Sequence, residues 1–240
     1  MKVLNFLFAI ISPLCILAFV ASCSDKEPTL KEDNATAACF RAVDYQYDAL
    51  LTKADIAKHV TIDEASYKMK NSPIKGEYGS SSYEWKSGRP DLEMELLGQV
   101  IVYPDVNRVT IKLLHFYSES ELELYSHSSA ISLFDQGYKK LSQAEYDELL
   151  ANLKKEYVND VAKYEQAKGF LDMRMNIKFA PIANLADRAY WKWHDEYGIE
   201  LVVLSGVTHF TIESKTSGDQ KIALDDAVKF AQEVLAKCNR

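Results

Sequence analysis

The feature that most limits the fold is a pair of adjacent segments rich in β-branched and aromatic residues. They are ELLGQVIVY at 95–103 and RVTIKLLHFY at 108–117, separated by PDVN. These residue types favour strands, whereas proline, aspartate and asparagine favour tight turns. The pair therefore predicts an antiparallel hairpin that turns at 104–107. Alternation along the second segment predicts four residues on one face: Val109, Ile111, Leu113 and His115.

Helical patterns lie on both sides of this predicted hairpin. Ser142 and Glu145 have the spacing of a capping box, and apolar residues then recur at every third or fourth position. This pattern predicts one long amphipathic helix that ends near Gly169. A similar start at Thr52 predicts a short helix at about 53–59.

The C-terminal third returns to strands and closes with a helix. Three segments predict an antiparallel set: AYWKWH at 189–194, IELVVLS at 199–205 and THFTIES at 208–214. A further strand is predicted at 81–86, and apolar residues from Leu224 to Cys238 recur at helical spacing. Antiparallel strands covered by helices predict an α+β fold, in a single domain at 37–240.

The first 22 residues have the layout of a secretory signal. Lys2 precedes a largely apolar run at 3–20, and the small residues Ala21 and Ser22 follow it. The alternative is a transmembrane anchor, since about 18 apolar residues approach the length that crosses a bilayer. Pro13 and the weak flanking charge argue against that alternative.

The end of this run resembles a lipobox, the signature of bacterial lipoproteins. It reads Val-Ala-Ser-Cys at 20–23. In that family the cysteine is joined to diacylglycerol, the signal is cut directly before it, and the new N-terminus is acylated. The resemblance implies lipid attachment at Cys23 and removal of 1–22. Several acyl chains on one residue make a stable anchor, whereas a single chain binds only marginally.

The residues after the cysteine bear on location. Residues 24–36 are charged and lack apolar periodicity, so we expect 23–36 to be a flexible tether. Ser24 in place of an aspartate resembles lipoproteins sorted to an outer membrane. The charged run at 25–27 resembles the tag that displays Bacteroidota lipoproteins on the cell surface. Periplasmic and surface orientations both stay open.

Two cysteines would remain in the mature chain. Cys15 leaves with the signal and Cys23 is acylated, which leaves Cys39 and Cys238. Two thiols in an oxidising exported compartment predict a disulfide, and the apolar face of the last predicted helix includes Cys238. The alternative is a pair of unrelated buried thiols.

The order of elements also resembles a group of secreted bacterial lipoproteins with a PsbP-like α/β sandwich. The segments that carry the likeness are NLADRAYWKW at 184–193, IELVVLSGVTHFTIES at 199–214 and the alanine-rich last helix, with ALLTKADIAKHV at 49–60 in the first half. The likeness covers about 39–238, although Ala186 stands where a glycine is commoner. It implies an antiparallel sheet covered by helices, with ligand or partner binding as the usual role.

Few features point to catalysis, a cofactor or nucleic acid. The net charge of −7 provides no basic stripe for nucleic acid. No G-x-S-x-G elbow, P-loop or dinucleotide fingerprint occurs. No metal site is predicted, because the histidines lack HExxH spacing and no cysteine supports them. The five histidines are His59, His115, His127, His194 and His209.

Five aromatic residues remain as candidates for ligand binding: Tyr83, Trp85, Tyr190, Trp191 and Trp193. Alternation places Tyr190 and Lys192 on one face of their predicted strand and the two tryptophans on the other. An open face would let these rings stack on sugars or hold a hydrophobic ligand. The alternative is that the aromatics form the core beneath a helix.

These observations predict a lipid-anchored envelope protein that binds a ligand or a protein partner without catalysis. A second hypothesis is a scaffold or assembly factor in an envelope complex, and a third is an enzyme without a linear motif. A binder should show a concave aromatic pocket, and a scaffold should show an exposed apolar patch of several hundred square ångströms. An enzyme should show clustered titratable groups in a cleft.

Overall fold

The structure is a computed structural model that describes residues 34–238. The predicted signal, Cys23 and most of the predicted tether lie outside this range. The first helix, α1 (Asn34–Ala42), begins inside the segment predicted as tether. Helical structure therefore starts slightly before residue 37.

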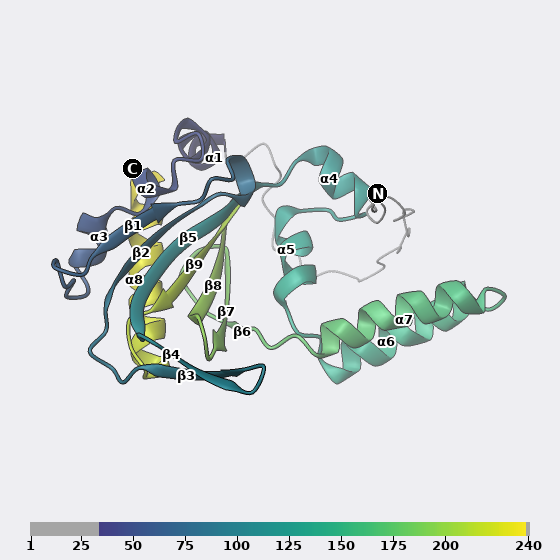
Figure 1. Cartoon of the computed structure of the whole chain (residues 1–240). Helices are drawn as coiled ribbons and strands as arrows, with labels where there is room; N and C mark the ends of the chain where they lie inside the picture. The colour runs from purple at the N-terminus through teal and green to yellow at the C-terminus, as the bar shows by residue number, and fades with distance from the viewer. Residues whose placement is uncertain (1–33, 239–240) are drawn as a thin grey trace, which may run out of the picture.

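A seven-stranded antiparallel sheet forms the centre of the fold, in the order β1-β2-β5-β9-β8-β7-β6 (Figure 1). Its strands are β1 (Lys68–Asn71), β2 (Ser80–Lys86), β5 (Val106–Phe116), β6 (Ala180–Pro181), β7 (Arg188–His194), β8 (Gly198–Ser205) and β9 (Thr208–Lys215). The three predicted C-terminal strands and the predicted strand at 81–86 are confirmed. The protein has an α+β fold.

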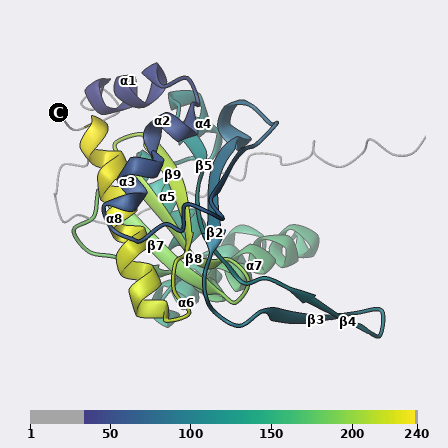
Figure 2. The same ribbon diagram turned by 60° about the vertical axis from the view of Figure 1, so that its left-hand side comes forward.

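Helices cover one face of this sheet. The longest, α8 (Gln220–Cys238), packs on β8 and β9, while α1, α2 (Tyr47–Leu50) and α3 (Lys53–Ala57) lie beside it (Figure 2). The predicted capping box starts α3, since Thr52 Oγ1 accepts a hydrogen bond from the Asp55 amide at 3.1 Å.

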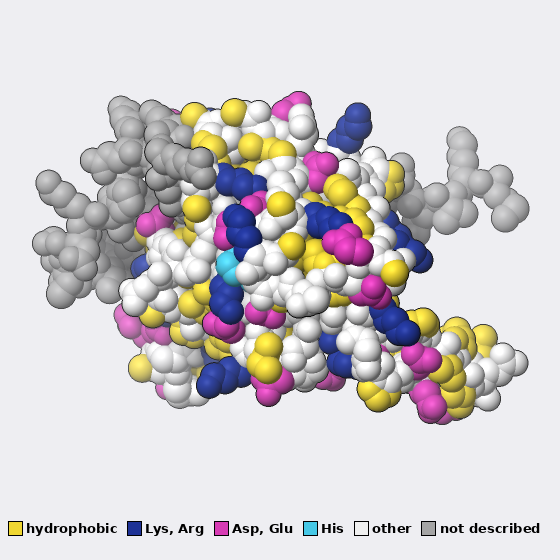
Figure 3. All heavy atoms as spheres, turned by 90° about the vertical axis from the view of Figure 1, so that its left-hand side faces the viewer, with side chains coloured by type: hydrophobic (Ala, Val, Ile, Leu, Met, Phe, Trp, Pro, Cys, Tyr) yellow, Lys and Arg dark blue, Asp and Glu magenta, His cyan; other side chains and the backbone are white. Residues whose placement is uncertain are grey.

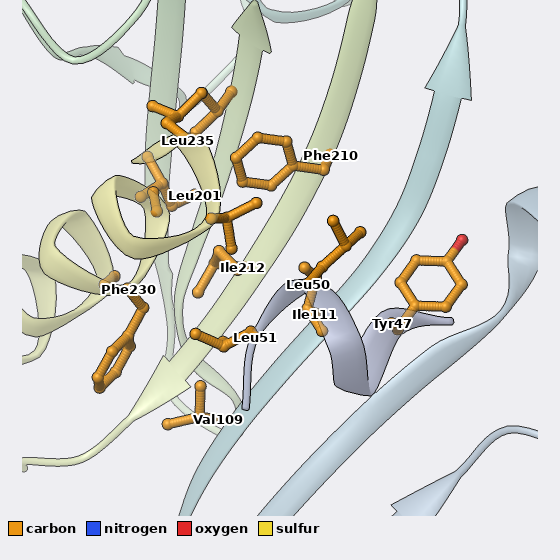
Figure 4. Packing of buried hydrophobic residues seen from close by; sticks show 14 of the residues in the cluster. Tyr47, Leu50, Leu51, Val109, Ile111, Leu201, Phe210, Ile212, Phe230 and Leu235 are labelled. Atoms are coloured by element: carbon orange, nitrogen blue, oxygen red, sulfur yellow. The ribbon is translucent and has the colours of Figure 1, made fainter. Parts of the chain in front are cut away.

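The main core lies between these helices and the sheet. Phe210 and Ile212 of β9 meet Phe230 of α8 and Ile111 of β5, all of them fully buried (Figure 4). Phe40 of α1 enters the same cluster, with its ring centroid 5.8 Å from that of Phe210. Apolar burial at this interface is the main force that holds helices and sheet together.

A disulfide joins the two ends of the described chain. Cys39 in α1 and Cys238 at the end of α8 are bonded, with Cα atoms 5.4 Å apart and a sequence separation of 199. This is the pairing predicted from the sequence. It links α1 to the helix that supports the centre of the sheet.

The predicted hairpin that turns at 104–107 is wrong. β4 (Gln99–Tyr103) pairs with β3 (Leu92–Leu96) in a separate two-stranded sheet, and β5 lies between β2 and β9. The turn is formed by Leu97 and Gly98, with φ values of 53° and 77°. Positive φ at both central residues is the geometry of a type I′ turn, which closes a hairpin in two residues.

The predicted assignment of residues to one face of β5 is correct only up to a bulge. Val109 and Ile111 share a face as predicted, which enters the main core, but the register with β9 shifts before His115. Leu113 has φ 54° at this point. As a result Leu114, rather than Leu113, is fully buried, and His115 turns to the face away from α8.

The prediction of a single long helix is also wrong, because this segment forms two helices. α6 (Gln143–Glu156) and α7 (Val161–Met175) pack against each other as an antiparallel pair that extends from the body (Figure 1). Asp160 caps the second helix by accepting a hydrogen bond from the Lys163 amide at 3.1 Å. Gly169 lies inside α7 and does not end it.

Candidate functional site

The predicted aromatic candidates do not form one open surface. Tyr83 and Trp85 are 1% and 2% exposed in the main core, and Trp191 and Trp193 pack partly buried against the same cluster. Tyr190 is buried on the opposite face of the sheet. Tyr83, Trp85 and Tyr190 thus serve packing, as the alternative expects, while Trp191 and Trp193 keep part of their surface exposed.

The face of the sheet away from α8 carries a ladder of paired charges. Lys112 Nζ lies 2.5 Å from Glu213 Oε1, and Lys192 Nζ lies 3.0 Å from Glu200 Oε2. Burial raises the pKa of Glu200, but hydrogen bonds from Lys192 and His194 outweigh it and lower that pKa below its ordinary value. These charges neutralise one another across neighbouring strands, which fits a structural role.

Titratable groups gather at one end of this face. His115 lies between two carboxylates, with Nδ1 2.8 Å from Glu77 Oε1 and Nε2 3.0 Å from Glu121 Oε2. Its ring centroid is 5.1 Å from that of His209, whose Nδ1 lies 3.1 Å from the Tyr117 hydroxyl. Clustered titratable groups are one feature that the enzyme hypothesis expects, and a cleft that holds them is the other.

The buried half of this cluster is closed over by α5 (Ala130–Tyr138). Phe134 and Tyr138 of this helix lie against His209, with ring centroids 5.8 and 6.5 Å away. Burial lowers the pKa of His209 to about 3, with a smaller contribution from the charge on His115. His209 is therefore a neutral packed residue at pH 7, rather than an acid or base open to a substrate.

This burial predicts a pH effect on stability. Below the ordinary histidine pKa of about 6.5, the unfolded chain gains a proton at His209 that the folded chain does not bind until about pH 3. The free energy of unfolding should thus fall as pH falls from 6.5, by at most about 1.4 kcal/mol per pH unit from this residue. Urea unfolding at pH 7 and 5.5 measures it.

The control for this effect is His209→Gln, which keeps a neutral polar side chain that does not titrate. Its stability should depend less on pH between 7 and 5.5 than that of the wild type. Carboxylates contribute at lower pH. Hydrogen bonds from Ser142 and Lys139, for example, lower the pKa of Glu145 to about 2, so its contribution to stability is lost only at lower pH. Equal slopes in the two proteins would contradict the assignment of a buried neutral His209.

The β3–β4 hairpin is an exposed apolar feature of the described residues. It projects from the body and pairs with no other strand of residues 34–238 (Figures 1 and 2). Its register places apolar residues on one face, namely Leu92, Leu96, Ile101 and Tyr103. The other face sets Glu93 and Glu95 opposite Val102 and Val100, whose side chains are 58% and 64% exposed. Figure 3 shows hydrophobic side chains along this projection at the lower right.

Leu97 at the hairpin tip is the most unusual of these residues. It is 97% exposed and has a positive φ, a conformation that bulky side chains rarely adopt. Asparagine followed by glycine is the preferred pair for this turn. Neither burial nor backbone preference accounts for a leucine here. A costly conformation that presents an exposed apolar side chain is typical of a contact site.

The elements predicted from the sequence do not include this hairpin, although a signal for it is present. Leu97-Gly98 lies between two runs of strand-forming residues, and glycine suits the second position of a type I′ turn. The residues at 104–107 are stronger turn formers, and for that reason the predicted turn lies there instead. Nothing in the residue types distinguished strands that enter the main sheet from strands that project from it.

Within residues 34–238, no helix has the length and apolarity needed to cross a membrane. Across those residues, no cluster of three or more histidine, cysteine, aspartate or glutamate side chains is arranged to hold a metal.

Comparisons with known proteins bear on the predicted resemblance. No protein-family model, curated protein or solved structure matches the chain. The likeness to PsbP-like lipoproteins therefore stays a prediction, while the α+β fold rests on the structure itself.

Proposed function

We propose that this protein is a lipid-anchored, protein-binding module of a bacterial envelope, and that it docks through the β3–β4 hairpin. The observation that supports docking is the exposed apolar hairpin with Leu97 at its tip. Contiguous apolar surface rimmed by polar residues is a mark of interaction sites. The buried aromatic residues give less support to a pocket for a small ligand.

The anchor in this proposal is lipid on Cys23. The lipobox-like residues 20–23 support it, and the outer membrane is the expected location, with the domain on the periplasmic side or at the cell surface. The scaffold hypothesis becomes part of the same proposal, because an anchored module that docks on another protein is a scaffold component.

A protein fits the hairpin better than a bilayer does. Glu93 and Glu95 lie within four residues of the tip, and no lysine or arginine occurs in 91–104. Carboxylates are costly to bring into a membrane, and anionic headgroups attract basic rather than acidic segments. The apolar surface is therefore assigned to contact with another folded chain.

Photo-crosslinking in living cells tests this function. A benzophenone amino acid placed at Leu97 of the full chain should give a covalent adduct to a protein after irradiation. The matched control places it at Ile222, an exposed apolar residue of α8 that is 55% exposed. The same cells can be grown with an alkyne-labelled fatty acid to test the anchor. The protein should carry the label, and Cys23→Ala should remove it.

Two outcomes would count against the proposal. Absence of an adduct at Leu97, or equal yields at Leu97 and Ile222, would mean that the hairpin has no special role in docking. Fatty-acid label that persists in Cys23→Ala would remove the anchor while leaving the docking result to stand on its own.

A further inference from the structure

We infer that the partner of the hairpin is a second copy of this chain, paired with the first through the free edge of β4. This inference rests on the proposed function, because it names the partner for the same surface. It follows from the backbone groups that β4 leaves unpaired, from the charges on β3 and β4, and from the place of Leu97.

The register of the hairpin fixes which backbone groups reach the free edge. Leu96 pairs with Gln99 next to the two-residue turn. In such a hairpin the pair beside the turn exchanges hydrogen bonds, and so does every second pair after it. The backbone groups of Gln99, Ile101 and Tyr103 therefore point toward β3. Those of Val100 and Val102 stand on the outer edge, where no other strand of residues 34–238 pairs with them.

The outward backbone groups of one β4 strand can pair with the same groups of a second β4 strand. If a second β4 lies antiparallel about a twofold axis through Ile101, Val100 of each copy falls opposite Val102 of the other. Each of the two Val100–Val102 pairs then exchanges both of its hydrogen bonds. Ile101 faces Ile101 of the second copy as a non-hydrogen-bonded pair, where side chains approach most closely. The same patch serves both copies, as a twofold interface requires.

Charge selects the β4 edge over the β3 edge. No charged residue occurs in β4, which reads QVIVY, whereas β3 carries Glu93 and Glu95. Antiparallel pairing of two β3 strands about Met94 would set Glu93 directly opposite Glu95 of the second copy, and like charges at that position destabilise a sheet. Pairing through β4 places the carboxylates on the two outer strands of a four-stranded sheet.

The same register also determines where Leu97 would lie in the pair. Gln99 falls opposite Tyr103 of the second copy, and two residues further on Leu97 falls opposite Asp105. Each hairpin tip would then lie at the base of the other hairpin, next to Pro104. Two strands alone are marginally stable in water, and a four-stranded sheet is more stable. Self-pairing therefore accounts for both the projection and its apolar tip.

Disulfide trapping in cells tests the geometry. Ile101→Cys in the full, anchored chain should form a symmetric disulfide, because Cβ atoms of directly opposed strand residues lie within reach of such a bond. The expected result is a species of twice the monomer mass that reductant converts to monomer. The matched control is Ile222→Cys, an exposed position of α8 that should remain monomeric.

A second substitution separates edge pairing from chance collision. Val100→Pro removes an N–H that points away from β3, so the hairpin keeps its internal hydrogen bonds while the edge loses a donor. Added to Ile101→Cys, it should abolish the trapped dimer and leave the melting temperature of the domain nearly unchanged. A dimer that persists with Val100→Pro would overturn pairing through β4.

The experiments distinguish the two levels of the argument. An adduct from Leu97 to a different protein, with no dimer from Ile101→Cys, would overturn the second copy as partner and leave the docking function standing. No adduct from Leu97 and no trapped dimer would reject both. A Leu97 adduct of twice the chain mass, together with the trapped dimer, would support both.

Discussion

Replacing Phe210 with alanine is expected to lower the free energy of unfolding by about 3–5 kcal/mol, the cost usual for removing a fully buried phenylalanine. Phe210 lies on the central strand β9 with no exposed surface, between the helices α1 and α8 and the sheet. The ring of Phe40 packs on it at 5.8 Å. Neither helix can close the resulting space without shifting the other, since a disulfide joins them. Urea unfolding followed by circular dichroism measures the change.

The control for this substitution is the same change at an exposed site. Phe170 in α7 is 48% exposed, so Phe170→Ala should cost much less, because little apolar contact is lost. If the two variants unfolded at the same urea concentration, the helix-covered face of the sheet would not be the stabilising core. A folded domain would then need another source of its stability.

Reduction of the Cys39–Cys238 disulfide is expected to cost about 2–4 kcal/mol of stability. The bond joins residues with a sequence separation of 199, so its removal frees the unfolded chain from a long-range constraint. The melting temperature of the wild type should fall when reductant is added. The variant with Cys39→Ala and Cys238→Ala should start at the lower value and should not respond to reductant.

Mass measurement of intact protein accompanies this test, since reduction of one disulfide adds two hydrogen atoms. Wild-type protein whose mass shows reduction but whose melting temperature is unchanged would contradict a stabilising role. Wild-type protein with free thiols before treatment would contradict the bond itself.

The C-terminal half of the fold was largely predictable from sequence. The strands at 188–194, 198–205 and 208–215 follow each other through short turns, so neighbours in sequence are neighbours in the sheet. Their alternation also placed Tyr190 and the two tryptophans on opposite faces, as the structure has them. Local signals suffice where strands pair with the next strand along the chain.

The middle of the chain was less predictable, because long-range competition decides its pairing. β5 joins β9, which begins about 90 residues later in the sequence, and this contact leaves β4 to pair with β3. The break between α6 and α7 was hidden for a different reason. Leu153, Tyr157 and Tyr164 lie on both sides of the turn, belong to one apolar cluster and keep nearly helical spacing, so the sequence pattern continues across the break.

The candidate site was the least predictable part. An apolar strand that projects from a domain has the same residue types as one that is buried, because both favour β-branched side chains. The histidine cluster could not be foreseen either, since the bulge at Leu113 is what turns His115 toward His209. Cys39 and Cys238 were the exception, because cysteine count and compartment restrict pairing without knowledge of the fold.

If the proposed lipid anchor holds the domain at a membrane, the bond between α1 and α8 also has a mechanical consequence. Tension that enters at the N-terminal end of α1 would cross from Cys39 to Cys238 and pass into α8, the helix packed on the central strands. Such a pull cannot peel α1 away past residue 39 while the bond is intact. The load would then reach β8 and β9, the strands on which α8 packs.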